Sequence, residues 1–350
     1  MTVPTPPPPP VNIADLVRGL LDGGYNNATG AVIRSITGSV NSGLIQQRTQ
    51  ELQAEAQRLR EAGERMSADN AVLRALTADL ETVMRQNTLA LQGIAERVQL
   101  SGIDAAAGMT RQLSLAGFGP EEIARLGIQW NQPDPQAVAR LVNFIESPAW
   151  ADELAQYGPR VLTTINNIAT RGFALGWSPQ RVANEIVGTV TALPQADANN
   201  LMRTLQLQSM RQATAVHQIA NADIIDYQIR MAVLDTRTCL SCIAQHGDIL
   251  PIGALIEDHY RGRCFSITHV RGLPDRNIES GVDWFNRQSA EMRLEIAGEA
   301  NFNALQAGAV ELRQFVHRYE DPIFGFMVRE ASLKGILGDA AEQYYSRNQN

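Results

Sequence analysis

Cysteine and aromatic residues are scarce in this sequence. Only 3 of its 350 residues are cysteines, and aromatic residues make up 6% of the chain. Because the cysteine count is odd and the N-terminus lacks a cationic segment followed by an apolar one, we expect neither a disulfide framework nor a secretory signal. The hydrophobic fraction of 44%, much of it Ala, Leu, Ile and Val, favours helices over a β-sandwich.

Long apolar runs and an excess of basic residues are also missing. No run approaches the roughly 18 apolar residues that a membrane-spanning helix requires, so no membrane span is expected. The formal net charge of -7 gives no basic footprint for free DNA over the whole surface. The composition therefore predicts a protein assembled in a cytosol. A local basic run, Arg261, Arg263, His269 and Arg271, is interpreted either as solvated surface or as a contact with packaged DNA or an acidic partner.

The three cysteines lie together in one segment. Cys239 and Cys242 form a Cys-x-x-Cys pair, and His259 and Cys264 form a second pair further along. Tetrahedral zinc accepts thiolate sulfur and imidazole nitrogen, so this layout predicts a closed Cys3His site for Zn2+. Four protein ligands leave no position for water. We therefore expect a structural ion, whose binding contributes on the order of 10 kcal/mol to local folding.

Other interpretations of this segment remain open. His246 and His269 are rival fourth ligands, and the cysteines could instead be buried or redox-active thiols. An HNH-type nuclease would use Asp258-His259 with His269 and Asn277. A zinc deaminase is excluded because no His-x-Glu element is present.

The cysteine segment carries a longer signature. In chain order it consists of Asp235, Arg237, Cys239, Cys242, Gly247, Pro251, His259, Arg263 and Cys264. This order resembles the Mu-like minor head proteins of tailed bacteriophages, the phage head morphogenesis family. The family usually has His-Pro-x-Cys-Arg-Cys in the second half, and this chain has Gly262 in place of the first of those cysteines. Three cysteines and one histidine still make a complete ligand set.

A second stretch resembles the C-terminal segment of the same family. It contains, in order, Gly281, Trp284, Phe285, Gly298, Gly308, Leu312, Phe315, Val316, Ser332, Leu333 and Lys334. The likeness covers roughly residues 155 to 338. The chain departs from it at Leu205, where family members commonly have the glutamate of Arg-Thr-Glu.

The resemblance implies a virion protein that works by binding and is not an enzyme. Its expected partners are the portal protein and the major capsid and scaffold proteins, at the head interior or portal vertex. Its expected roles are head assembly and DNA packaging or ejection. The alternatives are a zinc-containing DNA-processing enzyme and a helical scaffold protein of non-phage origin.

Hydrophobic periodicity predicts a predominantly α-helical α+β fold. A disordered Pro-rich tail is expected at 1–11, followed by a helical arm at 12–100. The arm contains a predicted helix of roughly 50 residues, which either packs against its own chain or a neighbouring subunit or forms a coiled coil. Its heptad seam consists of Ile45, Leu52, Leu59, Met66, Leu73, Leu80, Asn87 and Ile94.

Three further domains are expected. Residues 101–227 form a helical domain of short helices, ending in a long helix from about Ala196 to Tyr227, with Trp130, Trp150 and Trp177 as core anchors. Residues 228–272 form the zinc-binding β element, with short strands at 229–233, 248–252 and 265–270. Residues 273–350 form a helical C-terminal arm.

Overall fold

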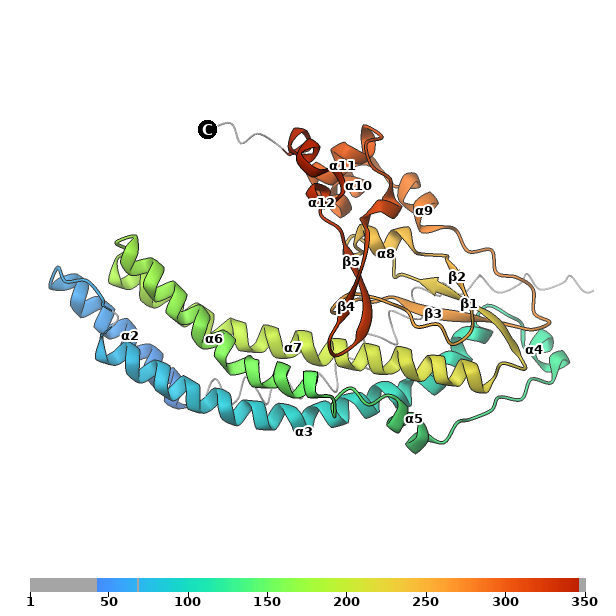
Figure 1. The fold of residues 1–350 in the computed structure, drawn as a ribbon, viewed down its shortest axis with the longest axis horizontal. Helices are drawn as coiled ribbons and strands as arrows, with labels where there is room; N and C mark the ends of the chain where they lie inside the picture. Colours follow the sequence, from blue (N-terminus) through green and yellow to red (C-terminus); the bar gives the residue numbers. More distant parts are fainter. Residues whose placement is uncertain (1–42, 68, 346–350) are drawn as a thin grey trace, which may run out of the picture. The chain divides into compact units, whose positions relative to one another are not determined.

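The structure is a computed structural model that describes residues 43–67 and 69–345. These residues are mostly helical and contain two small antiparallel sheets, which confirms the predicted fold class (Figure 1). The predicted tail at 1–11 lies outside the described residues. No helix among the described residues is long and apolar enough to cross a membrane.

Two compact units make up the chain. Within the described residues, the helical unit comprises 43–101 and 143–206, and the mixed unit comprises 102–142 and 207–345. Helices α3 and α7 each contribute to both units. The helices before the sheet are α2 (Gly43–Glu61), α3 (Ala71–Leu115), α4 (Pro120–Leu126), α5 (Pro135–Leu141), α6 (Pro148–Ala174) and α7 (Pro179–Ala220).

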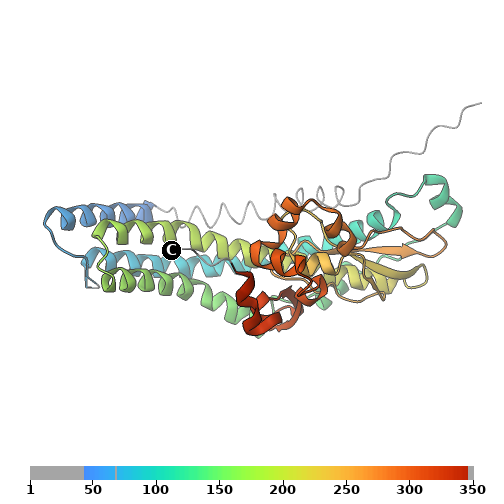
Figure 2. The ribbon, with the colours of Figure 1, turned by 90° about the horizontal axis from the view of Figure 1, so that it is seen from above.

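In the helical unit, α2, α6 and the parts of α3 and α7 that belong to it lie side by side (Figure 2). All eight predicted heptad positions, Asn87 included, are buried within this single chain. Polar contacts also join the helices. The indole N–H of Trp150, which is fully buried, donates to Gln92 Oε1 at 3.0 Å. Trp177 is only half-buried, so of the two predicted tryptophan anchors in this unit only Trp150 lies in the core.

The prediction of one heptad helix of roughly 50 residues is wrong. The chain leaves the helix at Gly63, which adopts a left-handed conformation with φ 68° that suits glycine. Helix α3 then begins beside Asn70, whose side-chain oxygen accepts the N–H groups of Val72 and Leu73. The two helices fold back on each other, and Asn70 also donates to Glu55 on α2 at 3.0 Å.

The short helices predicted for 101–200 are also corrected. Helix α3 runs on to Leu115, and α7 is continuous from Pro179 to Ala220, so it both begins and ends earlier than the long helix predicted from about Ala196 to Tyr227. Helix α6 begins at Pro148, contains Pro159 and is 27 residues long, so it is not one of the short helices that were predicted. Pro148 stands in the first turn, where proline is tolerated.

The mixed unit holds a three-stranded sheet in the order β2-β1-β3. The strands are β1 (Ile225–Met231), β2 (Ile249–Leu250) and β3 (Phe265–Val270). The last matches its predicted range and β2 lies within its range, but β1 begins four residues earlier than predicted, where a helix was expected. All pairs are antiparallel, with Ile229 opposite Ile267. Every residue of β3 is buried, because side chains pack on both of its faces. Trp130, also in this unit, is half-buried.

The C-terminal arm of the mixed unit was predicted to be helical, but it also contains strands. It contains a two-stranded hairpin, β4 (Val316–Asp321) with β5 (Gly325–Glu330). Helix α10 ends before Gly298, and Ser280, Ser289 and Ser332 cap three of the helices. The remaining elements are α8 (Leu240–Ala244), α9 (Gly281–Arg287), α10 (Ala290–Ala297), α11 (Glu299–Gln306), η1 (Leu312–Phe315), α12 (Leu333–Leu337) and η2 (Gly338–Tyr344).

Candidate metal centre

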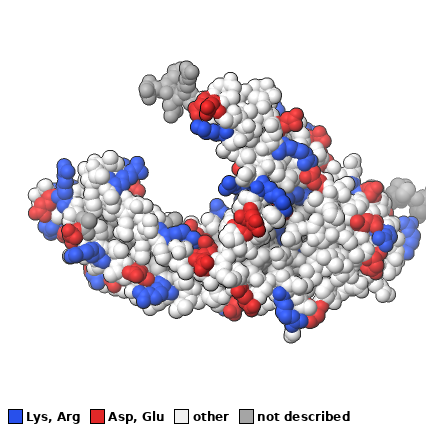
Figure 3. Space-filling view, viewed as in Figure 1, with Lys and Arg blue, Asp and Glu red and all other residues white. Residues whose placement is uncertain are grey.

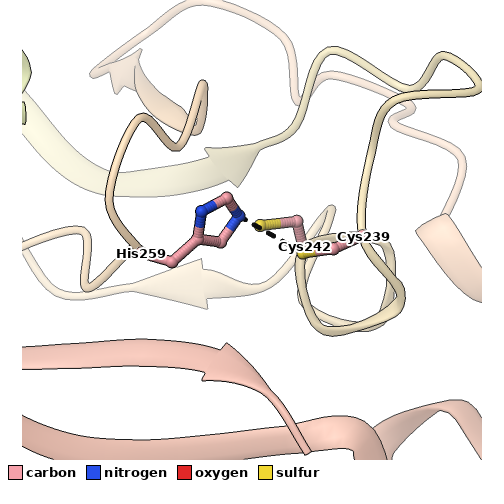
Figure 4. A group of neighbouring side chains, drawn as sticks. All are labelled: Cys239, Cys242 and His259. Atoms are coloured by element: carbon pink, nitrogen blue, oxygen red, sulfur yellow. Dashed lines mark hydrogen bonds between the residues drawn. The ribbon is translucent and has the colours of Figure 1, made fainter. Parts of the chain in front are cut away.

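The four predicted ligands come from two short segments that flank the sheet. Cys239 caps the N-terminus of α8 and Cys242 lies within that helix. His259 and Cys264 lie on the connection between β2 and β3, with Cys264 immediately before β3. The side chains of Cys239, Cys242 and His259 point toward one another (Figure 4).

Three of the four donor atoms converge in one group, and Cys264 belongs to a second group that shares Cys242 with the first. Cys239 Sγ lies 3.3 Å from His259 Nε2. The donor atoms of Cys239, Cys242 and His259 all lie within 4.8 Å of one another, and so do those of Cys242, Asp258 and Cys264. All three cysteines are free thiols. The cluster of Cys239, Cys242, Cys264 and His259 could therefore bind a metal such as zinc.

The donor set and its spacing fit tetrahedral zinc. Sulfur and nitrogen ligands at their usual distances from the ion are about 3.5 Å apart, close to the separation of Cys239 and His259. The imidazole is held by its other nitrogen, because His259 Nδ1 lies 2.9 Å from the carbonyl oxygen of Tyr260. A ligating histidine commonly makes such a contact, which fixes the orientation of its ring.

The cluster also favours the thiolate form of Cys239, its half-buried cysteine. Hydrogen bonds from Cys242 and then His259 lower the pKa of the Cys239 thiol to about 4, although burial acts in the opposite direction. Burial alone would lower the pKa of His259, but its contacts with Cys239 and Asp258 raise it to about 9. Both shifts favour a thiolate beside an imidazolium when no metal is bound. An ion would replace the imidazole proton.

The sequence did not reveal that Asp258 positions the ligands of the cluster. This carboxylate is fully buried, and it accepts the backbone N–H groups of His259 and Cys264, each at 2.9 Å. Its Oδ1 also lies 3.3 Å from Cys242 Sγ. Burial raises the pKa of Asp258, but the charges of Arg211 and His259 outweigh it and hold the value near 2. Asp258 thus fixes the loop that carries two of the ligands.

Two buried arginines complete the surroundings. Arg211 Nη2 donates to Asp258 Oδ2 at 2.7 Å, and its Nε donates to the carbonyl oxygen of Cys264 at 3.0 Å. Arg230 donates to the carbonyl oxygen of Glu257 at 2.6 Å, while its Nε and Nη2 atoms are buried without a hydrogen-bond partner. Burial would lower the pKa of Arg230, but the proximity of Cys264 and Asp258 raises it.

The charges of these groups balance when a divalent ion is bound. Three thiolates and a neutral imidazole around Zn2+ carry one net negative charge, and Asp258 adds a second. Arg211 and Arg230 supply two positive charges at the same place. Buried charges persist where they are paired, so the two arginines fit a metal-loaded cluster.

The rival histidines are engaged elsewhere. His246 Nδ1 accepts the backbone N–H of Ala232 at 2.9 Å, and burial lowers the pKa of this histidine to about 4. His269 stacks on Tyr227 with ring centroids 4.6 Å apart, and its Nε2 lies 3.0 Å from the carbonyl oxygen of Leu273. Neither histidine belongs to the groups of converging donors.

The predicted basic run is largely occupied by ion pairs. Both terminal nitrogens of Arg263 bind Asp235, at 2.5 and 2.7 Å. Arg271 binds Asp226 at 2.9 Å. Positive and negative side chains are interspersed on the face of the molecule seen in Figure 3.

No family model, no curated protein and no solved structure matches this chain. The assignment of a function therefore rests on the signature residues and on their geometry.

Proposed function

We propose that this chain is a minor head protein of a tailed bacteriophage, of the Mu-like head morphogenesis class. In this proposal a structural zinc ion is held by Cys239, Cys242, His259 and Cys264. The protein works by binding the portal and capsid interior during head assembly and DNA packaging or ejection. The observation that carries the proposal is the direct contact between the two stretches that resemble this family.

Two glycines of the signature lie at that contact. Gly247 has φ 90°, and a β-carbon added to it would lie 3.5 Å from the Cα of Ser280. The backbone N–H of Gly281 donates to the carbonyl oxygen of His246 at 3.0 Å. A β-carbon on Gly281 would lie 1.8 Å from the carbonyl oxygen of Ile243, so only glycine fits there. The close approach of the backbones thus requires glycine at 281, and the left-handed conformation favours glycine at 247.

The aromatic and Ser-Leu-Lys elements of the second stretch pack on the helix that carries Cys242. Leu240 and Ile243 of α8 share a hydrophobic core with Phe285, Phe315 and Leu333. Residues some 90 positions apart in the sequence therefore form one compact body. This supports the interpretation of the two stretches as parts of a single module.

The zinc ion has a structural role in this proposal. The four ligands leave no open position on a tetrahedral ion, so the ion would hold α8 against the loop before β3. The bidentate ion pair of Arg263 with Asp235 also joins the segment of α8 to the loop before β3. The result is a rigid surface suited to docking in a larger assembly.

The proposal is tested on particles from the phage or prophage that encodes this chain. We expect the chain in purified particles by mass spectrometry, and co-purification of the portal protein with the tagged chain. The double variant Cys239→Ser and Cys264→Ser is expected to lose zinc and to be incorporated poorly. Arg287→Gln, a change at an exposed arginine of α9, serves as the control and is expected to behave as wild type.

Two results would overturn the proposal. One is absence of the chain from purified particles together with failure to retain the portal protein. The other is a nuclease activity that is lost in His259→Ala while the fold is retained, which would assign the cluster to a DNA-processing enzyme.

A further inference from the structure

The C-terminal arm contains a pocket that the metal centre does not use. It has a volume of about 480 Å3 and lies between α9, α11 and the turn that precedes η1. Phe285, Val310 and Leu312, which belong to the hydrophobic core, lie at its base. Half-buried Phe302 and Leu305 of α11 form an apolar wall. Its size is in the range of sites that take a side chain or small ligand.

One arginine in this pocket has a guanidinium nitrogen without a hydrogen-bond acceptor. Arg293 of α10 lies over the ring of Phe302, with the guanidinium carbon 5.8 Å from the ring centroid. Its Nε is buried without a hydrogen-bond partner, and within the described part of the chain its guanidinium makes no ion pair. The second arginine of the pocket, Arg313, already binds Asp248 at 2.6 Å. A buried donor without an acceptor is costly, so Arg293 favours an incoming acceptor.

We propose that this pocket is a docking site for an acidic segment of a partner protein. The segment would insert an aspartate or glutamate beside Arg293 and a neighbouring apolar side chain against Phe302 and Leu305. This proposal goes beyond the function proposed above and does not depend on it.

The charges around the pocket favour a carboxylate over a phosphate group. A guanidinium matches the planar carboxylate with two parallel hydrogen bonds. Glu311 also lines the pocket, and Asp248 already occupies Arg313. Both would repel a group with two negative charges more strongly than a group with one. The apolar wall adds a preference for a hydrophobic neighbour, which a nucleic acid backbone does not offer.

The test uses the full chain with zinc bound and an array of acetylated, amidated dodecapeptides. In each peptide one glutamate stands one to four positions from a leucine or phenylalanine, and a matched peptide carries glutamine instead. We expect the wild type to bind a subset of the glutamate peptides at least tenfold more tightly than their glutamine partners. Arg293→Gln is expected to abolish that difference.

Two further variants keep the test decisive. Arg287→Gln removes an arginine of α9 that binds Glu279 outside the pocket lining, and it should retain the preference. Gln306→Trp places a bulky side chain at an exposed position of the pocket without changing its charge, and it should block binding even if Arg293→Gln folds poorly. The proposal is overturned by the absence of any glutamate preference, by its persistence in both pocket variants, or by tighter binding of phosphoserine peptides.

Discussion

Arg211 and Asp258 form an ion pair that is almost entirely withdrawn from solvent. Their side chains are 3% and 0% exposed, and Nη2 lies 2.7 Å from Oδ2. Arg211 belongs to α7, and Asp258 directly precedes the ligand His259. The pair therefore links a long helix to the loop of the metal centre, and loss of either partner would leave an unpaired buried charge.

Replacing Asp258 by asparagine is expected to lower both stability and zinc affinity. Breaking a buried pair from one side costs about 3–5 kcal/mol of unfolding free energy. Loss of a group that orients metal ligands lowers affinity about 10- to 100-fold. Urea unfolding with zinc saturated and competition with a chelator measure the two effects separately. Asp248→Asn, which removes the partner of exposed Arg313, is the control and should cost about 1 kcal/mol or less. Equal losses in the two variants would contradict this prediction.

Removal of a ligand is expected to abolish stoichiometric zinc binding. His259→Ala and Cys264→Ser should each purify without a full equivalent of zinc, because three remaining donors hold the ion weakly. Faster amide hydrogen exchange is then expected in α8 and β3, the elements that the ion joins. His317→Ala, at an exposed histidine of β4, should retain the metal. A full equivalent of zinc in His259→Ala would show that the histidine is not a ligand.

The local features of the site could be predicted from the sequence. The Cys-x-x-Cys pair and the later His259 and Cys264 are short-range patterns, and the flanking strands follow from runs of apolar and β-branched residues. Asp258, Arg211 and Arg230 could not be identified in this way. Their roles depend on a helix, a strand and a loop that meet only in the folded chain, and no spacing rule connects them.

The same limit explains the errors in the fold. The heptad pattern continues through Gly63 and Asn70, and only tertiary packing decides whether such weak positions bend or break a helix. The eight seam positions are nevertheless buried, so the pattern identified the right face. The hairpin of β4 and β5 was missed because its sequence, with Asp321 and a Gly325 at φ 73°, carries charges among few apolar residues.

Gly281→Ala is expected to be strongly destabilising. The added methyl group would overlap the carbonyl oxygen of Ile243 and approach the His246 side chain to 2.8 Å, and backbone atoms cannot yield cheaply. Overpacking of this kind typically costs about 1–3 kcal/mol or more of unfolding free energy. Gly188→Ala in α7 is the matched control, because nothing lies within 4 Å of its added methyl group. That variant should be unchanged or more stable by about 0.5–1 kcal/mol. Similar midpoints for both variants in thermal unfolding would contradict the close contact between the two stretches.

Acidification is expected to destabilise the fold through His246 before the buried carboxylate of Asp258, whose pKa is about 2, gains a proton. Burial lowers the pKa of His246 to about 4 from an ordinary value of 6.5. The unfolded chain therefore binds a proton at higher pH than the folded chain does. The stabilising effect is complete above pH 6.5 and is lost as the pH falls from 6.5 toward 4. A shift of this size corresponds to about 3 kcal/mol at most.

The contribution of His246 is isolated by comparing the wild type with His246→Gln, whose side chain can still accept the N–H of Ala232. Unfolding free energies are measured by urea at saturating zinc between pH 7 and pH 4, because loss of metal would also destabilise the protein in acid. His217, whose pKa burial also lowers, acts in the same direction in both proteins and cancels in the difference. The wild type should lose more stability than the variant over this range. Parallel pH profiles would mean that His246 gains a proton in the folded state as readily as in the unfolded one.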